Sequence, residues 1–165
     1  MKTTHQQKVT LGEAGELLVA SRLLAHGLIA GQLPRGYRSD DLYVERGDEI
    51  VHIQVKTRQG PRSWPVGTIE VRPNRYYGLV HFESLDSGDL IRPTVYLLPS
   101  KVVAASVGLH SRIYLKAYPG QTGKGVPNIT DKWRMATEMT EAGFGAGWLK
   151  PYEEPWADFA ARKLD

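Results

Sequence analysis

Residues 41–46 and 50–57 both alternate between apolar and polar side chains. A period of two is typical of β-strands that bury one face. The dipeptide Gly47-Asp48 between the two runs is a turn signal that joins antiparallel strands. The sequence therefore predicts a β-hairpin whose apolar side chains all face one core. The polar side chains of both strands are then brought together on the opposite face.

The polar face of this hairpin carries Asp41 on the first strand, and Gln54 and Lys56 on the second. The alternation places Asp41 and Gln54 near each other across the pair. An amide and a lysine side by side on a strand can hold a water molecule and a metal ion near a phosphate. The order and spacing of these residues therefore suit metal-dependent hydrolysis of a phosphodiester. His52 shares this face, and we expect a structural role for it.

An amphipathic helix is predicted over residues 11–27, upstream of the hairpin. Its apolar side chains fall on one broad arc, which consists of Ala14, Leu17, Ala20, Leu23, Leu24 and Leu28. Glu13 and Glu16 fall inside that arc. Because burying an unpaired carboxylate is unfavourable, Glu16 is expected to have a partner, such as a metal ion or a lysine. Glu13 better suits the start of the helix, where a negative charge is favourable.

Three segments in this order resemble the PD-(D/E)XK nuclease superfamily, namely residues 12–20, 41–44 and 53–57. The third segment has Gln-x-Lys in place of Asp/Glu-x-Lys. It is most similar to the branch that includes some homing endonucleases, methyl-directed restriction enzymes and relatives of archaeal Holliday-junction resolvases. Residues 76–80 and 95–99 resemble later strands of that branch. The combination of the segments, and none of them singly, is what points to this superfamily.

The resemblance implies an α/β fold with a restriction-endonuclease-like core, a mixed β-sheet with flanking helices. It implies a metal-dependent DNA endonuclease that uses Mg²⁺ or Mn²⁺ as cofactor, since the donors are hard oxygen atoms. The catalytic residues implied are Glu16, Asp41, Gln54 and Lys56. The metal ligands implied are Asp41, Gln54, the carbonyl of Val55, and Glu16.

Gln54 departs from the superfamily pattern, because an amide brings no charge to the metal. Metal affinity is expected to be lower unless Glu16 or Asp40 compensates. Two alternatives stay open. A neutral Gln54 favours a catalytically inactive nuclease-fold module that binds DNA. In the other alternative, an assembly or regulatory protein, Lys56 forms a buried ion pair with Asp41 or Glu16.

The composition bounds the class of protein. The chain has 165 residues, enough for one domain with one sizeable core. It has no cysteine, which excludes disulfides and thiolate zinc sites. No apolar run reaches the length of a membrane span and the N-terminal residues are polar, so a cytoplasmic protein is expected. The five histidines show no metal-ligand spacing.

Basic residues are concentrated between positions 56 and 75, where Glu70 is the one acidic residue. The arginines of this stretch are Arg58, Arg62, Arg72 and Arg75. They are predicted to contact the phosphates of nucleic acid that flank a cleavage site. The alternative is a solvated loop. Because a duplex has two strands to cut, a homo-oligomer, either a dimer or a tetramer, is expected.

The chain is expected to form a nuclease-like core over residues 1–108. The first nine residues of this core are expected to lack regular structure. A C-terminal extension, residues 109–165, is expected to pack on that core within a single domain. Further predicted elements are a short strand at 69–72, strands at 76–82 and 94–98, a helix at 101–107 capped by Ser100, a strand at 111–117, and helices at 131–142 and 155–163. The stretch 62–75 contains two prolines, so the helix usual at this place in the superfamily is expected to be short, displaced or missing.

Overall fold

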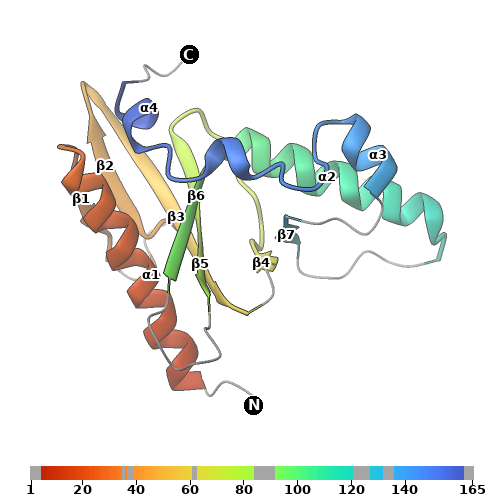
Figure 1. Ribbon diagram of the computed structural model, residues 1–165, viewed down its shortest axis with the longest axis horizontal. Helices are drawn as coiled ribbons and strands as arrows, with labels where there is room; N and C mark the ends of the chain where they lie inside the picture. The colour runs from red at the N-terminus through yellow and green to blue at the C-terminus, as the bar shows by residue number, and fades with distance from the viewer. Residues whose placement is uncertain are drawn as a thin grey trace.

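A five-stranded mixed β-sheet lies at the centre of the computed structural model (Figure 1). The structure describes residues 5–34, 36, 39–60, 63–83, 92–120, 127–131 and 136–161. Its elements are α1 (His5–Ala25), β1 (Ile29–Gln32), β2 (Leu42–Arg46), β3 (Glu49–Gln59), β4 (Ser63–Pro65), β5 (Arg75–Glu83), β6 (Arg92–Pro99), α2 (Ser100–Ala117), β7 (Asn128–Thr130), α3 (Ala136–Glu141), the 3₁₀-helix η1 (Lys150–Tyr152) and α4 (Trp156–Ala161). The predicted fold class, α/β with a mixed sheet and flanking helices, is confirmed.

The strands of the large sheet follow the order β1-β2-β3-β5-β6. Neighbouring strands are antiparallel except for β3 and β5, which run parallel. The predicted hairpin is confirmed, with Val44 opposite Val51 and Leu42 opposite Ile53. Gly47 makes the turn with φ 60°, in the region that glycine adopts without strain. A second, two-stranded sheet pairs β4 with β7.

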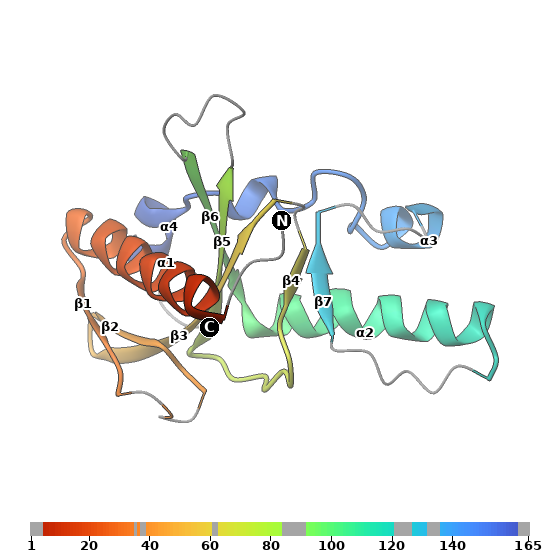
Figure 2. The same cartoon turned by 90° about the horizontal axis from the view of Figure 1, so that it is seen from below.

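Helices cover both faces of the large sheet (Figures 1 and 2). On one face, α1 and α4 pack over the apolar side of the hairpin, and Val19, Leu23 and Phe159 are buried there. On the other face, α2 packs through Val103 and Val107 over β5 and β6. Each face thus has its own apolar core, because a sheet between two helical layers is buried on both sides.

The tail contributes a tryptophan to each of the two cores. Trp156 of α4 is buried in the core under α1, and Trp148 is buried in the core under α2. The predicted strand at 111–117 is wrong, because α2 runs unbroken from Ser100 to Ala117. Its residues 111–117 are largely exposed, so no buried face imposes an extended conformation there. The helix therefore continues across the boundary expected at residue 108.

Between β3 and β5 no helix occurs within residues 63–74, the described part of this connection, in line with its prolines. The strand predicted at 69–72 is also wrong, since those residues pair with no other strand. Ser100 does not cap α2 as predicted. It is the first residue of the helix, and its hydroxyl donates to the Arg72 carbonyl at 2.9 Å and accepts from the Arg72 amide at 3.0 Å. Ser100 instead fastens this connection to the helix.

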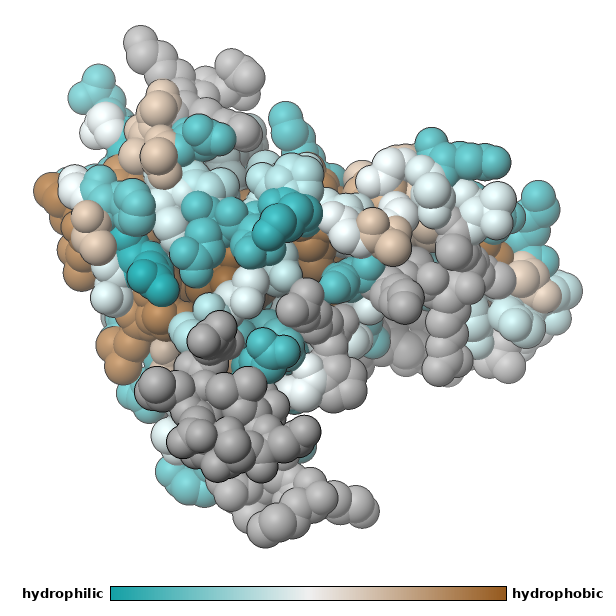
Figure 3. All heavy atoms as spheres, viewed as in Figure 1, coloured by the Kyte–Doolittle hydropathy of each residue, from teal (hydrophilic) through white to brown (hydrophobic). Residues whose placement is uncertain are grey.

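Helix α1 begins earlier than predicted, at His5, so residues 5–9 are helical and Glu13 lies well inside the helix. The predicted apolar arc was too broad. Leu17 and Leu24 are 54% and 53% exposed, and Figure 3 shows hydrophobic atoms at the surface on the side where α1 lies. The face of α1 that packs on the sheet runs instead through Gly15, Val19 and Leu23. Among the described residues, no helix is long and apolar enough to cross a membrane.

Helix α1 approaches the sheet most closely at Gly15. A Cβ atom at this position would collide with the hydroxyl of Thr57 on β3. At Gly12, in the same helix, a Cβ would meet no atom within 4 Å. The absence of a side chain at Gly15 therefore sets the distance between α1 and β3, whereas Gly12 has no such requirement.

Gly15→Ala and Gly12→Ala are expected to change stability in opposite directions. Alanine favours a helix interior over glycine by about 1 kcal/mol, so Gly12→Ala should raise the free energy of unfolding by up to that amount. Gly15→Ala should lower it by about 1–3 kcal/mol, because the helix must move off the strand. Urea unfolding of both variants measures this, and Thr57→Ala should restore part of the loss. Equal effects of the two substitutions would contradict the close approach.

Candidate active site

Asp41 lies directly before β2, at the point where β2 and β3 stop pairing. Its backbone N–H still donates to the Ile53 carbonyl at 3.0 Å. The next N–H of β3 on this side belongs to Val55, and it donates to the side chain of Asp41. The distance to Asp41 Oδ2 is 2.6 Å. In a strand, the N–H and C=O of one residue point to the same neighbour. The carbonyl of Val55 therefore also points to the edge of β3 that β2 leaves open.

Gln54 is 7% exposed, and its Oε1 is buried without a hydrogen-bond partner among the described residues. An unsatisfied buried acceptor costs about 1–3 kcal/mol, so such a group needs an explanation. Gln54 and Lys56 share one side of β3, because successive side chains on a strand alternate. A cation or a water molecule beside it would satisfy the amide oxygen.

Lys56 and Asp41 are half-buried and influence each other's charge. Burial lowers the pKa of Lys56 below its ordinary value, and the Asp41 carboxylate opposes that effect. Burial raises the pKa of Asp41, while the hydrogen bond from the Val55 amide and the charge of Lys56 lower it. The two side chains are therefore close enough to shift each other's pKa, and both are partly shielded from solvent.

Glu16 reaches the same place from α1. Its carboxylate raises the pKa of Lys56, the last of the influences on that lysine after burial and the charges of Asp41 and Arg75. Gln32, on β1, donates to Glu16 Oε2 at 3.1 Å and so holds the side chain toward the sheet. The close packing of α1 at Gly15 brings this part of the helix against β3. The structure thus brings together Glu16, Asp41 and Lys56, with Gln54 beside Lys56 on the same strand.

The donor set at this edge is two carboxylates, one amide oxygen and one backbone carbonyl. Within the described residues there is no group of three or more His, Asp or Glu side chains that could hold a metal ion. The unsatisfied Oε1 of Gln54 fits a hard cation such as Mg²⁺, which prefers oxygen ligands.

Asp40 is not placed to supply the metal-binding charge that Gln54 lacks. Its side chain is fully buried and forms ion pairs with Arg72 at 3.0 Å and with Arg75 at 2.9 Å. His52 Nδ1 lies 3.5 Å from the same carboxylate, which gives His52 a structural place as expected. Glu70 completes the network, at 2.8 Å from Arg75 and 3.3 Å from Arg72.

Sequence reasoning missed this network. Asp40 precedes β2, whereas Glu70 and Arg72 lie in the connection that leads to β5, and the sequence gives their charges but no pairing. One signal was available, because two consecutive aspartates at a strand start must point to opposite sides, and an inward carboxylate needs a cation.

The four arginines predicted to contact phosphates are in different situations. Arg72 and Arg75 are engaged by carboxylates inside the protein. Arg62 lies outside the described residues. Arg58 is half-buried and follows Lys56 on the same side of β3, and its Nε has no hydrogen-bond partner in the described part of the chain. Phosphate binding stays a prediction, and Arg58 is the arginine best placed for it.

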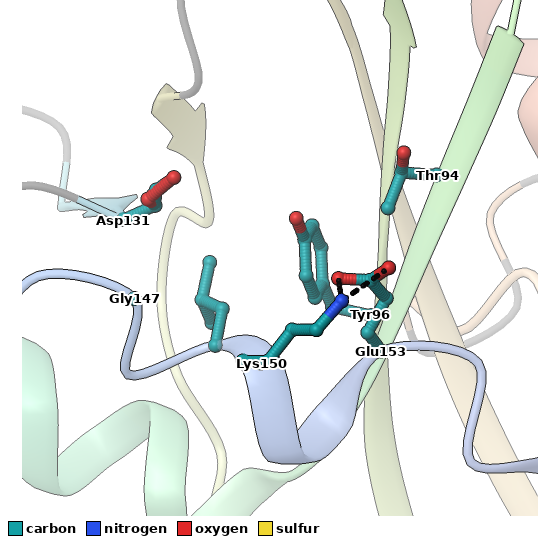
Figure 4. Close-up of a pocket in the computed structure, with 7 residues that line it drawn as sticks. Thr94, Tyr96, Asp131, Gly147, Lys150 and Glu153 are labelled. Atoms are coloured by element: carbon teal, nitrogen blue, oxygen red, sulfur yellow. Dashed lines mark hydrogen bonds and ion pairs between the residues drawn. The ribbon is translucent and has the colours of Figure 1, made fainter.

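A cavity of about 290 Å³ lies elsewhere, between β6 and the turn that contains η1 (Figure 4). It is lined by Thr94, Tyr96, Asp131, Gly147, Leu149, Lys150 and Glu153. Lys150 Nζ lies 3.1 Å from both carboxylate oxygens of Glu153 at its mouth. None of the residues predicted for the site lines this cavity.

Comparison with known proteins gives a structural likeness and no match in sequence. No protein-family model matches the chain, and no curated protein matches it. Among solved structures, the bacterial homing endonuclease I-Ssp6803I is similar, with a TM-score of 0.46 and 17% sequence identity. The likeness covers 96% of this chain and 93% of that chain. This TM-score and identity are too low to transfer a function, so the function must be argued from the residues of the site.

Proposed function

We propose that this protein is a DNA endonuclease that hydrolyses phosphodiester bonds with a divalent cation, Mg²⁺ or Mn²⁺. The observation that carries the proposal is the pair of half-buried charges where β2 leaves β3: Asp41, which accepts from the Val55 N–H at 2.6 Å, and Lys56, whose pKa the Asp41 carboxylate raises. Gln54, on the same side of β3 as Lys56, adds a buried amide oxygen without a partner among the described residues.

The cation would be held by the carboxylate of Asp41, the amide oxygen of Gln54 and the carbonyl of Val55. Glu16 would bind through water molecules or hold a second cation. When bound, a divalent cation supplies Lewis-acid polarisation of the phosphoryl oxygen and a more acidic water. The Val55 N–H, by occupying Asp41 Oδ2, orients the carboxylate so that its other oxygen is available.

Lys56 is the residue that would act on the attacking water and on the phosphate. Burial lowers its pKa, which brings the lysine closer to the pH at which it can accept a proton. In its charged form it stabilises the negative charge that develops on the phosphate. The Asp41 carboxylate opposes the effect of burial and raises the pKa of the lysine.

Two rival functions make different use of the same residues. An inactive DNA-binding module would bind DNA without cutting it, and the neutral Gln54 is what favours that function. An assembly or regulatory protein would use Lys56 in a buried ion pair with Asp41 or Glu16, and both carboxylates raise the pKa of Lys56. Cleavage in Mg²⁺, binding without cleavage, or neither distinguishes the three functions.

Lys56→Ala and Asp41→Asn are expected to reduce cleavage by a factor of about 10²–10³ each, because each removes a charge that acts on the transition state. Plasmid, branched-junction and single-stranded DNA, incubated with Mg²⁺ and with Mn²⁺, provide the measurement and identify the substrate. Because cutting both strands of a duplex needs two sites, we expect two copies to act together. Lys101→Ala, an exposed lysine on α2, is the control and should cut at the parent rate. Full activity of Lys56→Ala would rule out this site.

Substitutions of Gln54 separate stability from activity. Gln54→Met has similar volume and removes the unsatisfied oxygen, so the metal-free protein should become more stable by about 1–3 kcal/mol while cleavage is lost. Gln54→Glu adds a negative charge toward the cation, so the Mg²⁺ concentration needed for half-maximal cleavage should fall. Thermal unfolding and metal titrations measure the two effects. A loss of stability in Gln54→Met would indicate that the oxygen already has a partner.

Arg58→Ala is expected to weaken binding to duplex DNA and to flatten its salt dependence. One lost phosphate contact should reduce the slope of log affinity against log salt by about one unit. Binding is measured in Ca²⁺ or without divalent ions, where cleavage does not interfere. Lys101→Ala again serves as the control. An unchanged slope would mean that Arg58 belongs to the solvated surface and that DNA approaches from another side.

A further inference from the structure

Arg75 is the most deeply buried charged residue near the site, with 1% of its surface exposed. It is the first residue of β5 and pairs with His52 in the parallel register of β3 and β5. Burying a guanidinium is unfavourable unless its donors are satisfied. Its Nη1 donates to Glu70 at 2.8 Å, its Nη2 lies 2.9 Å from Asp40 Oδ1, and its Cζ lies 5.7 Å from the centre of the Tyr77 ring.

The same Nη2 also donates to the hydroxyl of Ser39 at 2.9 Å. Ser39 has φ 62°, a left-handed conformation that residues with a side chain rarely adopt. Such a conformation persists where the surrounding structure imposes it. Arg75 thus holds both residues that immediately precede Asp41, one through its hydroxyl and the other through its carboxylate.

From this geometry we propose that Arg75 is a positioning residue, which fixes Ser39 and Asp40 so that the Asp41 carboxylate meets the Val55 N–H at the open edge of β3. The inference rests on the proposed function for its catalytic consequence. The placement of Asp41 itself is a structural claim that can be tested without metal or DNA. Arg72 supports the arrangement from the other oxygen of Asp40, at 3.0 Å.

The electrostatic environment agrees with this placement. Burial is the largest influence on the pKa of Asp41 and of Lys56, raising the first and lowering the second. Arg75 lowers the pKa of both, which requires its charge to lie close to the two side chains. The charge of Arg75 thus opposes the larger effect of burial and favours the ionised form of Asp41.

Arg46 provides a matched control, because it is a second buried arginine in the same sheet, 5% exposed. It donates to the Phe159 carbonyl at 3.3 Å, lies 4.9 Å from the centre of the Phe159 ring, and pairs with Glu49 at 3.7 Å. These contacts lie at the other end of β2, away from Asp41. Arg46→Lys and Arg75→Lys therefore make the same chemical change in the core, from a planar guanidinium to an ammonium group. Only Arg75→Lys makes this change next to Asp40.

The test measures hydrogen exchange of the Val55 amide by NMR in metal-free protein, relative to the amide of Val51 inside the β2–β3 ladder. In Arg75→Lys, this relative exchange rate should rise about tenfold, because Asp41 no longer holds the Val55 N–H in place. In Arg46→Lys, the relative rate should stay at the parent value. Asp40→Asn should resemble Arg75→Lys, and the double variant should show much less than the sum of the two effects.

Cleavage gives the second measurement. With saturating Mg²⁺, the rate of Arg75→Lys should fall by about a hundredfold, as expected for a misplaced catalytic group, and that of Arg46→Lys should stay near the parent rate. An unchanged Val55 exchange in Arg75→Lys would overturn the inference, as would an equal rise in both variants. A parent protein that never cuts DNA, but whose Val55 responds to Arg75→Lys, would reject the proposed function and support the positioning of Asp41.

Glu70→Gln covers the case in which Arg75→Lys does not fold. The Glu70 side chain is 58% exposed, so its substitution does not disturb the core. Loss of its charge weakens the contact with Nη1 of Arg75, which the amide oxygen of glutamine can make only as a neutral acceptor, and the relative exchange rate of Val55 should rise about threefold. A rate equal to that of the parent would overturn the inference in that case.

Discussion

The hydrogen bond from the Val55 amide to the Asp41 carboxylate is the contact on which the site depends. The backbone of β2 ends its pairing with β3 one residue earlier, and a side chain then replaces a backbone carbonyl as acceptor. This replacement leaves the edge of β3 open without leaving its donor unsatisfied. The open edge is where side chains from both faces of the sheet can meet, Glu16 from the side of α1 and Lys56 from the opposite side.

Buried charge is distributed around this edge in two distinct ways. Asp40 forms ion pairs with Arg72 and Arg75, which tie the segment before Asp41 to the start of β5. Lys56 and Asp41 are only half-buried, and their pKa values are shifted by burial in the direction that favours the neutral forms. An ion-paired network beside a half-buried pair suits the proposed function, because buried ion pairs can hold neighbouring side chains in place.

The hairpin and three of its polar residues could be predicted because a period of two with one buried face determines the register. The face of α1 that contacts the sheet could not be predicted. Gly15 allows the close contact because it has no side chain, whereas the helical pattern was identified from apolar side chains alone. Residues 111–117 were misassigned because they are exposed on nearly all sides, so neither helical nor extended periodicity is enforced by burial. The ion pair of Asp40 with Arg75 could not be predicted either. The chain offers many pairs of opposite charges, and only the fold determines which of them come into contact.

The parallel pairing of β3 with β5 also has a consequence for the order in which the protein folds. The β2–β3 hairpin can form from neighbouring residues, but a parallel partner requires the chain to return from the far end of β3. Contacts of this kind close a long loop before they gain any stability, and they form late. A folding chain that has formed α1 and the hairpin has already structured the segments that carry Glu16, Asp41, Gln54 and Lys56. Arg75 has not yet joined them, because β5 is not yet paired with β3. The reactive groups would be completed as a site at the end of folding, when most of the molecule around them is already in place.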